Sequence, residues 1–132
     1  MKRFLNFFLV LIFPCFILFG CKHSPSILPV HDEVLTYPLP LDLVYLRTLD
    51  AIQAHPEWEL DVTDKEKGII KLRNMRYSSF ADADLRTATL LVKRIGSAET
   101  TVQLAPESQA VVGAEEILKL VSEYLSREVS QR

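Results

Sequence analysis

Cysteine is scarce in this sequence, which holds Cys15 and Cys21 and no other among its 132 residues. Both lie in or beside an apolar run at the start of the chain. If that run is removed as a leader, Cys21 is the one thiol that remains, and no disulfide can form within one chain. A zinc site built from cysteine and histidine is excluded for the same reason.

The sequence also lacks an excess of basic residues and any recognisable catalytic motif. The chain has 15 Lys and Arg against 17 Asp and Glu, a formal charge of -2, so a strongly basic surface for nucleic acid is not expected. No G-x-S-x-G elbow accompanies His55, which precedes a proline. We therefore predict that the chain is not an enzyme and holds no metal or cofactor.

A calcium loop is the nearest alternative to that prediction. Asp82 and Asp84, with Ser78 and Ser79, offer oxygen ligands within residues 78–84. The spacing lacks the central glycine and the distal glutamate of an EF-hand loop, so we interpret this segment as a solvated loop.

What the sequence does have is a marked N-terminal leader. Lys2 and Arg3 precede residues 4–19, which are apolar except for Asn6 and Pro14. This run is shorter than the roughly 20 residues of a membrane-spanning helix and is interrupted by proline, so it indicates a secretory signal peptide over residues 1–20.

The leader ends in Leu18-Phe19-Gly20-Cys21, which resembles the lipobox of bacterial lipoproteins, although Phe19 is larger than the residue usual there. The resemblance implies cleavage before Cys21, a diacylglyceryl thioether on its sulfur and an acyl chain on its new amino group. Two or three acyl chains attach a protein stably to a membrane.

Residues 21–33 then comprise the lipidated cysteine and a tether with Pro25 and Pro29. By analogy with enterobacterial lipoproteins, in which Asp after the cysteine retains the protein in the inner membrane, Lys22 favours delivery to the outer membrane, facing the periplasm.

Residues 34–132 suffice for one domain with one core. A short strand is expected at 34–38, and a helix capped by Asp42 is expected to run to Ala54. A second helix, over 113–127, has its apolar residues on one stripe. Two hairpins lie between these helices, the second with Val92 opposite Val102 and Leu90 opposite Leu104.

Residues 57–63 alternate strictly and predict the first hairpin, with Trp58, Leu60 and Val62 on its buried face. The turn is 64–68, with Gly68 at a positive φ. In the expected register Val62 faces Ile70, Leu60 faces Leu72, Asp61 faces Lys71, and Glu59 faces Arg73.

The order β-α-β-β-β-β-α predicts an α+β two-layer sandwich, in which an antiparallel sheet of four to five strands carries two helices on one face. This layout, with the segment TDKEKGIIKLR at 63–73, resembles periplasmic domains of bacterial lipoproteins. It is distantly similar to the C-subunit lipoprotein of the β-barrel assembly machinery, and implies a scaffold or accessory subunit.

Two functions follow as hypotheses. The preferred one is a non-enzymatic envelope subunit that binds a protein partner. The alternative is a carrier of a small ligand or lipid, which needs an apolar cavity of about 300 Å³ or more between sheet and helices. The candidate partner-binding residues are the charged side chains of the first hairpin and two aromatic residues that follow it: Glu59, Asp61, Lys71, Arg73, Tyr77 and Phe80.

Overall fold

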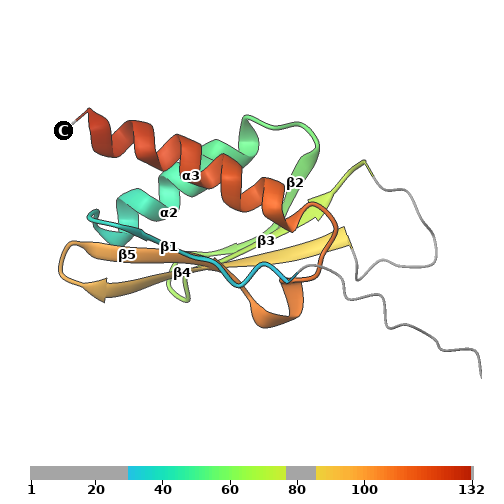
Figure 1. The fold of residues 1–132 in the computed structure, drawn as a ribbon, viewed down its shortest axis with the longest axis horizontal. Helices are drawn as coiled ribbons and strands as arrows, with labels where there is room; N and C mark the ends of the chain where they lie inside the picture. The colour runs from blue at the N-terminus through green and yellow to red at the C-terminus, as the bar shows by residue number, and fades with distance from the viewer. Residues whose placement is uncertain (1–29, 77–85, 132) are drawn as a thin grey trace, which may run out of the picture.

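The computed structural model describes residues 30–76 and 86–131, in which five strands form one antiparallel sheet in the order β1-β5-β4-β3-β2. Helices α2 and α3 lie together on one face of that sheet (Figure 1). The predicted α+β two-layer sandwich is confirmed. The elements in chain order are β1 (Val34–Tyr37), α2 (Leu41–Gln53), β2 (Trp58–Asp64), β3 (Ile69–Asn74), β4 (Thr87–Gly96), β5 (Glu99–Leu104), the 3-10 helix η3 (Pro106–Ser108) and α3 (Ala114–Ser130).

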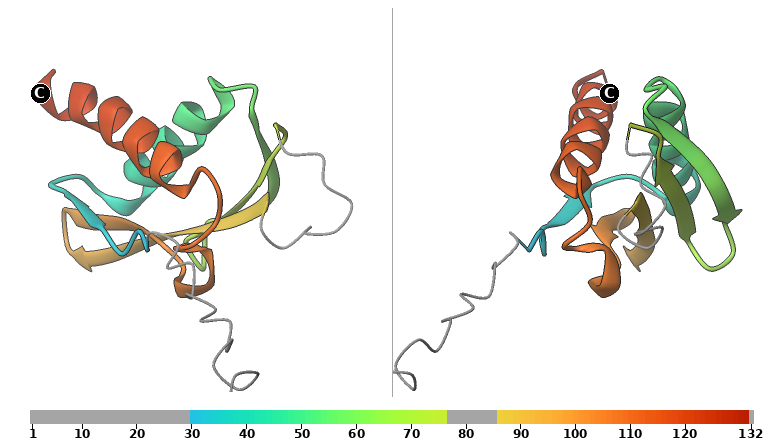
Figure 2. Two further views of the ribbon diagram at one scale, coloured as in Figure 1. Left: turned by 45° about the vertical axis from the view of Figure 1, so that its right-hand side comes forward. Right: turned by 90° about the vertical axis from the view of Figure 1, so that its right-hand side faces the viewer.

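The core fills the space between the helices and the sheet. Strand residues of one parity point toward the helices, and aliphatic side chains from both layers exclude water there. The twist of the sheet lifts β2 toward α2 (Figure 2). Trp58, the first residue of β2, is 5% exposed and belongs to the core. The largest fully buried side chains are aliphatic except for Asn74: Ile52, Ile70, Leu72, Leu90, Leu104, Ile117, Leu125, Val44, Val92, Val102 and Val121.

The first hairpin matches its predicted register over only half its length. Leu60 pairs with Leu72, and Glu59 pairs with Arg73, as expected. Beyond Leu60 the register shifts by a β-bulge, which places two residues of β2 against one of β3.

The bulge corrects three predictions. Val62 pairs with Lys71 instead of Ile70 and is 50% exposed, so it does not belong to the core. Asp61 does not face Lys71, because the extra residue falls at this point in β2. The turn is one residue shorter than the expected 64–68, because Asp64 still pairs with Ile69.

The second hairpin is confirmed. Val92 pairs with Val102 and Leu90 with Leu104, and all four side chains are buried. β5 then pairs with β1 along four residues, from Val34 opposite Gln103 to Tyr37 opposite Thr100. This long-range pairing makes β1 one edge of the sheet, while β2 is the other.

Helix α2 begins at Leu41, and its N-cap is Pro40 rather than the predicted Asp42. The Pro40 carbonyl accepts from the amides of Leu43 and Val44, so Asp42 lies inside the first turn, where its carboxylate contacts Lys65 Nζ at 2.7 Å. A carboxylate is favourable there because it faces the positive end of the helix dipole.

Helix α3 follows Gly113 and carries the predicted stripe, with Ile117, Leu118, Val121 and Leu125 buried. It extends to Ser130, slightly farther than the sequence pattern indicated. Within the described residues, neither helix has the length and hydropathy needed to cross a membrane.

Candidate functional site

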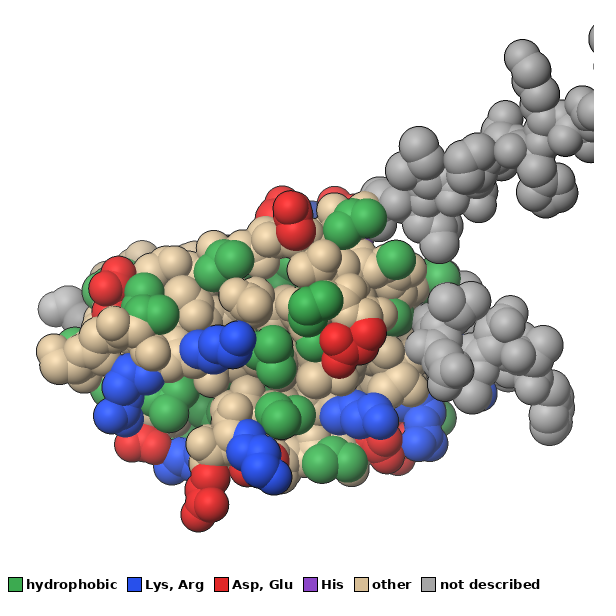
Figure 3. All heavy atoms as spheres, turned by 90° about the horizontal axis from the view of Figure 1, so that it is seen from below, with side chains coloured by type: hydrophobic (Ala, Val, Ile, Leu, Met, Phe, Trp, Pro, Cys, Tyr) green, Lys and Arg blue, Asp and Glu red, His purple; other side chains and the backbone are tan. Residues whose placement is uncertain are grey.

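The sheet face opposite the helices is the broadest candidate surface. It is the lower side of the sheet in Figure 1 and is viewed directly in Figure 3, where apolar, basic and acidic side chains are mixed. Side chains alternate along each strand, so the residues between the buried ones point to this face. We call it the open face, and its outward residues are Val34, Thr36, Glu59, Val62, Ile69, Lys71, Arg73, Thr89, Leu91, Lys93, Thr101 and Gln103.

Three of the four predicted charged residues come together on this face. Glu59 is aligned with Arg73, and Arg73 Nη2 donates to Asp61 Oδ1 at 3.2 Å. Both side chains of this ion pair are partly solvated, at 46% and 33% exposure for Arg73 and Asp61. A pair so placed contributes at most about 1 kcal/mol to folding.

Lys71 is separate from this ion pair. It is aligned with Val62 on one side and Thr89 on the other, and forms no ion pair with any described residue. Lys93, on the same face of β4, is likewise without one. Lys93 was not predicted as a site residue, although it follows Val92, which the second hairpin places on the opposite face of β4.

Aliphatic side chains lie between these charges. The pairing of β3 with β4 puts Ile69 beside Leu91, and Val34 lies two strands farther along the same row, 53% exposed. This row was not predicted, because it depends on which strands are neighbours. The two predicted aromatic site residues, Tyr77 and Phe80, and the loop 78–84 lie outside the described residues.

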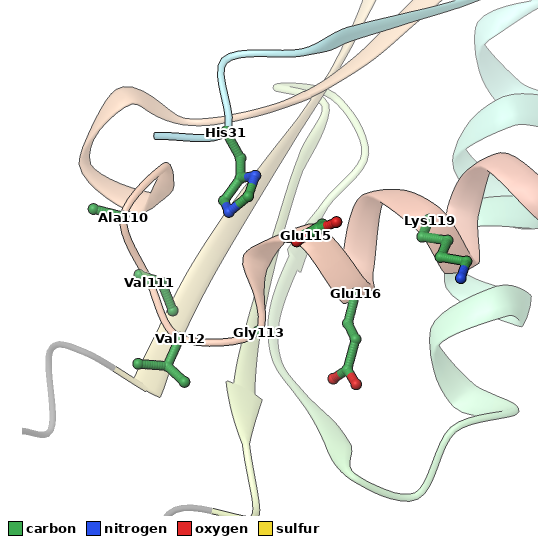
Figure 4. A pocket seen from close by; sticks show the side chains of 8 residues that line it. All are labelled: His31, Ala110, Val111, Val112, Gly113, Glu115, Glu116 and Lys119. Carbon is green, nitrogen blue, oxygen red and sulfur yellow. The ribbon is translucent and has the colours of Figure 1, made fainter. Parts of the chain in front are cut away.

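A second candidate surface lies at the start of α3. It is an open groove of about 490 Å³ lined by His31, residues 110–113, Glu115, Glu116 and Lys119. Figure 4 shows the His31 side chain between the 110–113 loop and the first turn of the helix. The His31 amide donates to the Gln109 carbonyl at 3.0 Å, which holds the chain entering β1 against the segment leaving β5.

Buried polar contacts hold the 110–113 loop in place. Gly113 has a φ of 83°, and a Cβ there would lie 3.0 Å from both Trp58 Cζ2 and Asn74 Nδ2. Asn74 Nδ2 in turn donates to the Val112 carbonyl at 3.5 Å, and its Oδ1 accepts from the Arg76 amide at 3.0 Å. The loop therefore sits directly on the end of the core.

The groove differs from the cavity that a carrier requires. It has the volume predicted for one, but it opens on the surface beside α3, whereas the layer between sheet and helices is packed with Leu90, Leu104, Ile117 and Leu125. We therefore keep protein binding ahead of ligand transport.

Several titratable groups have altered pKa values. Burial raises the pKa of the Tyr45 phenol, whose hydroxyl donates to the Ile69 carbonyl at 3.1 Å, and burial also raises the pKa of Tyr37. A hydrogen bond from Lys65 lowers the pKa of Asp42, and the Lys67 amide lowers that of Asp64. Among the described residues no three metal-ligating side chains cluster.

Few known proteins are similar to this chain. No family model and no curated protein sequence matches the chain. Among solved structures, the crystal structure of the ZhuI aromatase/cyclase from Streptomyces sp. R1128 is similar at 13% identity and a TM-score of 0.38, covering 75% of this chain and 85% of that one.

This comparison corrects one prediction. From the sequence, the chain was predicted not to be an enzyme, whereas the similar structure is that of an aromatase/cyclase. The prediction is contradicted and we withdraw it. At this TM-score the similarity assigns no reaction, substrate or catalytic residue to the chain.

Proposed function

We propose that the chain is a lipoprotein of the cell envelope, anchored through Cys21 in the outer membrane, whose folded domain is an accessory subunit that binds another envelope protein. The leader and the Leu18-Phe19-Gly20-Cys21 motif support the anchor, and Lys22 supports the outer membrane. The observation that carries the binding role is the open face of the sheet.

The chemistry of this face suits a protein partner. Val34 and Val62 are half exposed, Ile69 lies beside Leu91 in the row that ends at Val34, and Val62 is aligned with Lys71. Protein interfaces typically combine an apolar centre with a polar, solvated rim. Lys71 and Lys93 have no ion pair among the described residues, so their charges can pair with acidic side chains of a partner.

Site-specific photo-crosslinking in living cells tests this role. A photoreactive amino acid replaces Val62 on the open face or Leu46 on α2, two side chains with nearly equal exposure of 50% and 52%. We expect a discrete crosslinked product from position 62 and none from position 46. Adding Lys71→Glu should reduce the yield at position 62 several-fold, because it places the opposite charge beside the probe.

Two results would contradict the proposal. If positions 46 and 62 gave the same products in the same yield, the crosslinks would reflect exposure alone. If Lys71→Glu left the yield at position 62 unchanged while the protein remained folded, the charges of the open face would not take part in binding.

A further inference from the structure

The groove at the start of α3 has an apolar floor. Ala110, Val111 and Val112 line it, and Val112 is 42% exposed although the loop that carries it is held by Asn74. A volume of about 490 Å³ is that of a pocket for a few side chains. Solvent therefore contacts the Val112 side chain on a loop whose backbone accepts a hydrogen bond from Asn74.

The lining of the groove carries the two carboxylates Glu115 and Glu116 and the ammonium group of Lys119, and two further carboxylates follow His31 along the chain. Glu115 lies in the first turn of α3, and Asp32 and Glu33 follow the groove residue His31 and are exposed. None of these three carboxylates forms an ion pair with a described residue. Glu116 shares Arg76 with Glu57, at 3.5 and 3.4 Å respectively, and among the described residues of the lining Lys119 is the single Lys or Arg.

The charges around the groove argue against several classes of ligand. Free amides at a helix start attract anions, but Glu115 and Glu116 already occupy that positive end. The same carboxylates repel an anionic lipid surface. A metal ion lacks the three clustered ligands it needs among the described residues.

We propose that this groove binds a short peptide segment of a partner protein in which an aliphatic side chain is flanked by Lys or Arg. The aliphatic side chain covers Val111 and Val112, and the flanking cations pair with Glu115 and with the carboxylates of Asp32 and Glu33. This second binding surface is separate from the open face and does not depend on lipid anchoring.

The test uses the full chain, labelled with ¹⁵N and purified in a neutral detergent, and two synthetic probes. One is acetyl-Lys-Leu-Lys-Leu-Lys-amide and the other is its twin with Glu in place of each Lys. We expect the Lys peptide, and not the Glu peptide, to shift the amide resonances of residues 110–119. Glu115→Lys should weaken binding about fivefold, as expected for losing one exposed ion pair of about 1 kcal/mol.

Matched substitutions separate the groove from general attraction. Val112→Ser should weaken binding, whereas Val62→Ser, at a comparably exposed valine of the open face, should not. Glu66→Lys, at an exposed acid of the β2–β3 turn, is the control for charge and should leave affinity unchanged.

Several outcomes would overturn the proposal. They are equal shifts with both peptides, shifts centred on the open face, and no shift at the highest peptide concentration reached. If Lys22→Gln with His23→Gln raised the affinity of the Lys peptide several-fold, the groove would belong to the chain's own preceding residues and not to a partner.

Discussion

Gly68 closes the turn between β2 and β3 with a φ of 65°, a conformation that side-chain-bearing residues rarely adopt. Its carbonyl accepts from the Val92 amide at 2.7 Å, so this turn is hydrogen-bonded to the middle of the sheet. A Cβ on residue 68 would lie 2.0 Å from the Val92 carbonyl oxygen. Backbone strain and a steric clash therefore act together at this position.

Gly68→Ala should lower the free energy of unfolding by about 2 to 4 kcal/mol, more than left-handed strain alone would cost. Chemical denaturation measures the change. Gly96→Ala is the control, because Gly96 has no positive φ and its nearest contact is the Glu99 Cβ at 3.3 Å. Equal losses for the two variants would show that the Val92 carbonyl is not the obstacle.

Single residues show what local pattern can and cannot predict. The glycine turn was predicted, because a positive φ leaves a clear mark in sequence. The exposure of Val62 was not, because alternation gives no sign of where a bulge interrupts it. The candidate ion pair was correspondingly assigned to Lys71, whereas Asp61 contacts Arg73.

Among the elements, β2 is the edge strand that departs most from regular geometry. Its bulge follows Leu60, and its outward residues include Glu59 and Asp61. Bulges and charged side chains are the usual means by which an edge strand avoids pairing with another molecule. The bulge also turns Val62 from the core to the open face, and so contributes an aliphatic group to the proposed interface.

Val62→Thr should therefore change the free energy of unfolding by no more than about 0.5 kcal/mol, as for an exposed site. Leu72→Ala, at a side chain with 0% exposure on the neighbouring strand, should cost about 2 to 5 kcal/mol. Thermal or urea unfolding compares the two. A loss of more than about 2 kcal/mol for Val62→Thr would place Val62 in the core, as the regular register required.

Both hairpins could be predicted from sequence because their partners are neighbours along the chain. The contact between β3 and β4 and the return of β1 to β5 could not, since they depend on which long-range pairing buries most apolar surface. For the same reason the row containing Ile69 and Leu91, and the groove formed where His31 meets Gln109, became visible only in three dimensions.

For the whole molecule, the altered pKa values predict how stability depends on pH. Asp42 and Asp64 have lowered pKa values in the folded state, so their stabilising contribution is complete above their ordinary range and is lost as pH falls through the lowered values. Tyr37 and Tyr45 have raised pKa values in the folded state, so their stabilising contribution is complete at neutral pH. This contribution is lost as pH rises through the raised values.

The free energy of unfolding should thus decline below about pH 4 and above about pH 10. Denaturant midpoints measured across pH test this. Asp42→Asn with Asp64→Asn should flatten the acid side, and Tyr45→Phe should flatten the alkaline side. An unchanged acid limb in the double variant would mean that these two carboxylates do not set it.

Membrane attachment through Cys21 can be tested by substitution. Cys21→Ser should abolish lipidation and leave residues 1–20 attached, because the serine hydroxyl cannot form the thioether that the lipoprotein resemblance requires. Cys15→Ser, within the leader, should be processed like the natural sequence. Mass spectrometry of the purified proteins distinguishes the two, and an unmodified N-terminus downstream of position 21 would contradict the lipoprotein assignment.

The place of β1 has a mechanical consequence. Tension applied from the N-terminal side enters the described domain at the hydrogen bond between His31 and Gln109 and passes directly into β1. Among the strands that the structure describes, β1 pairs with β5 alone, through four residue pairs. Under load β1 is therefore the first strand to peel away, and its departure would bare the backbone of β5 as a new edge while the hairpins behind it remain paired.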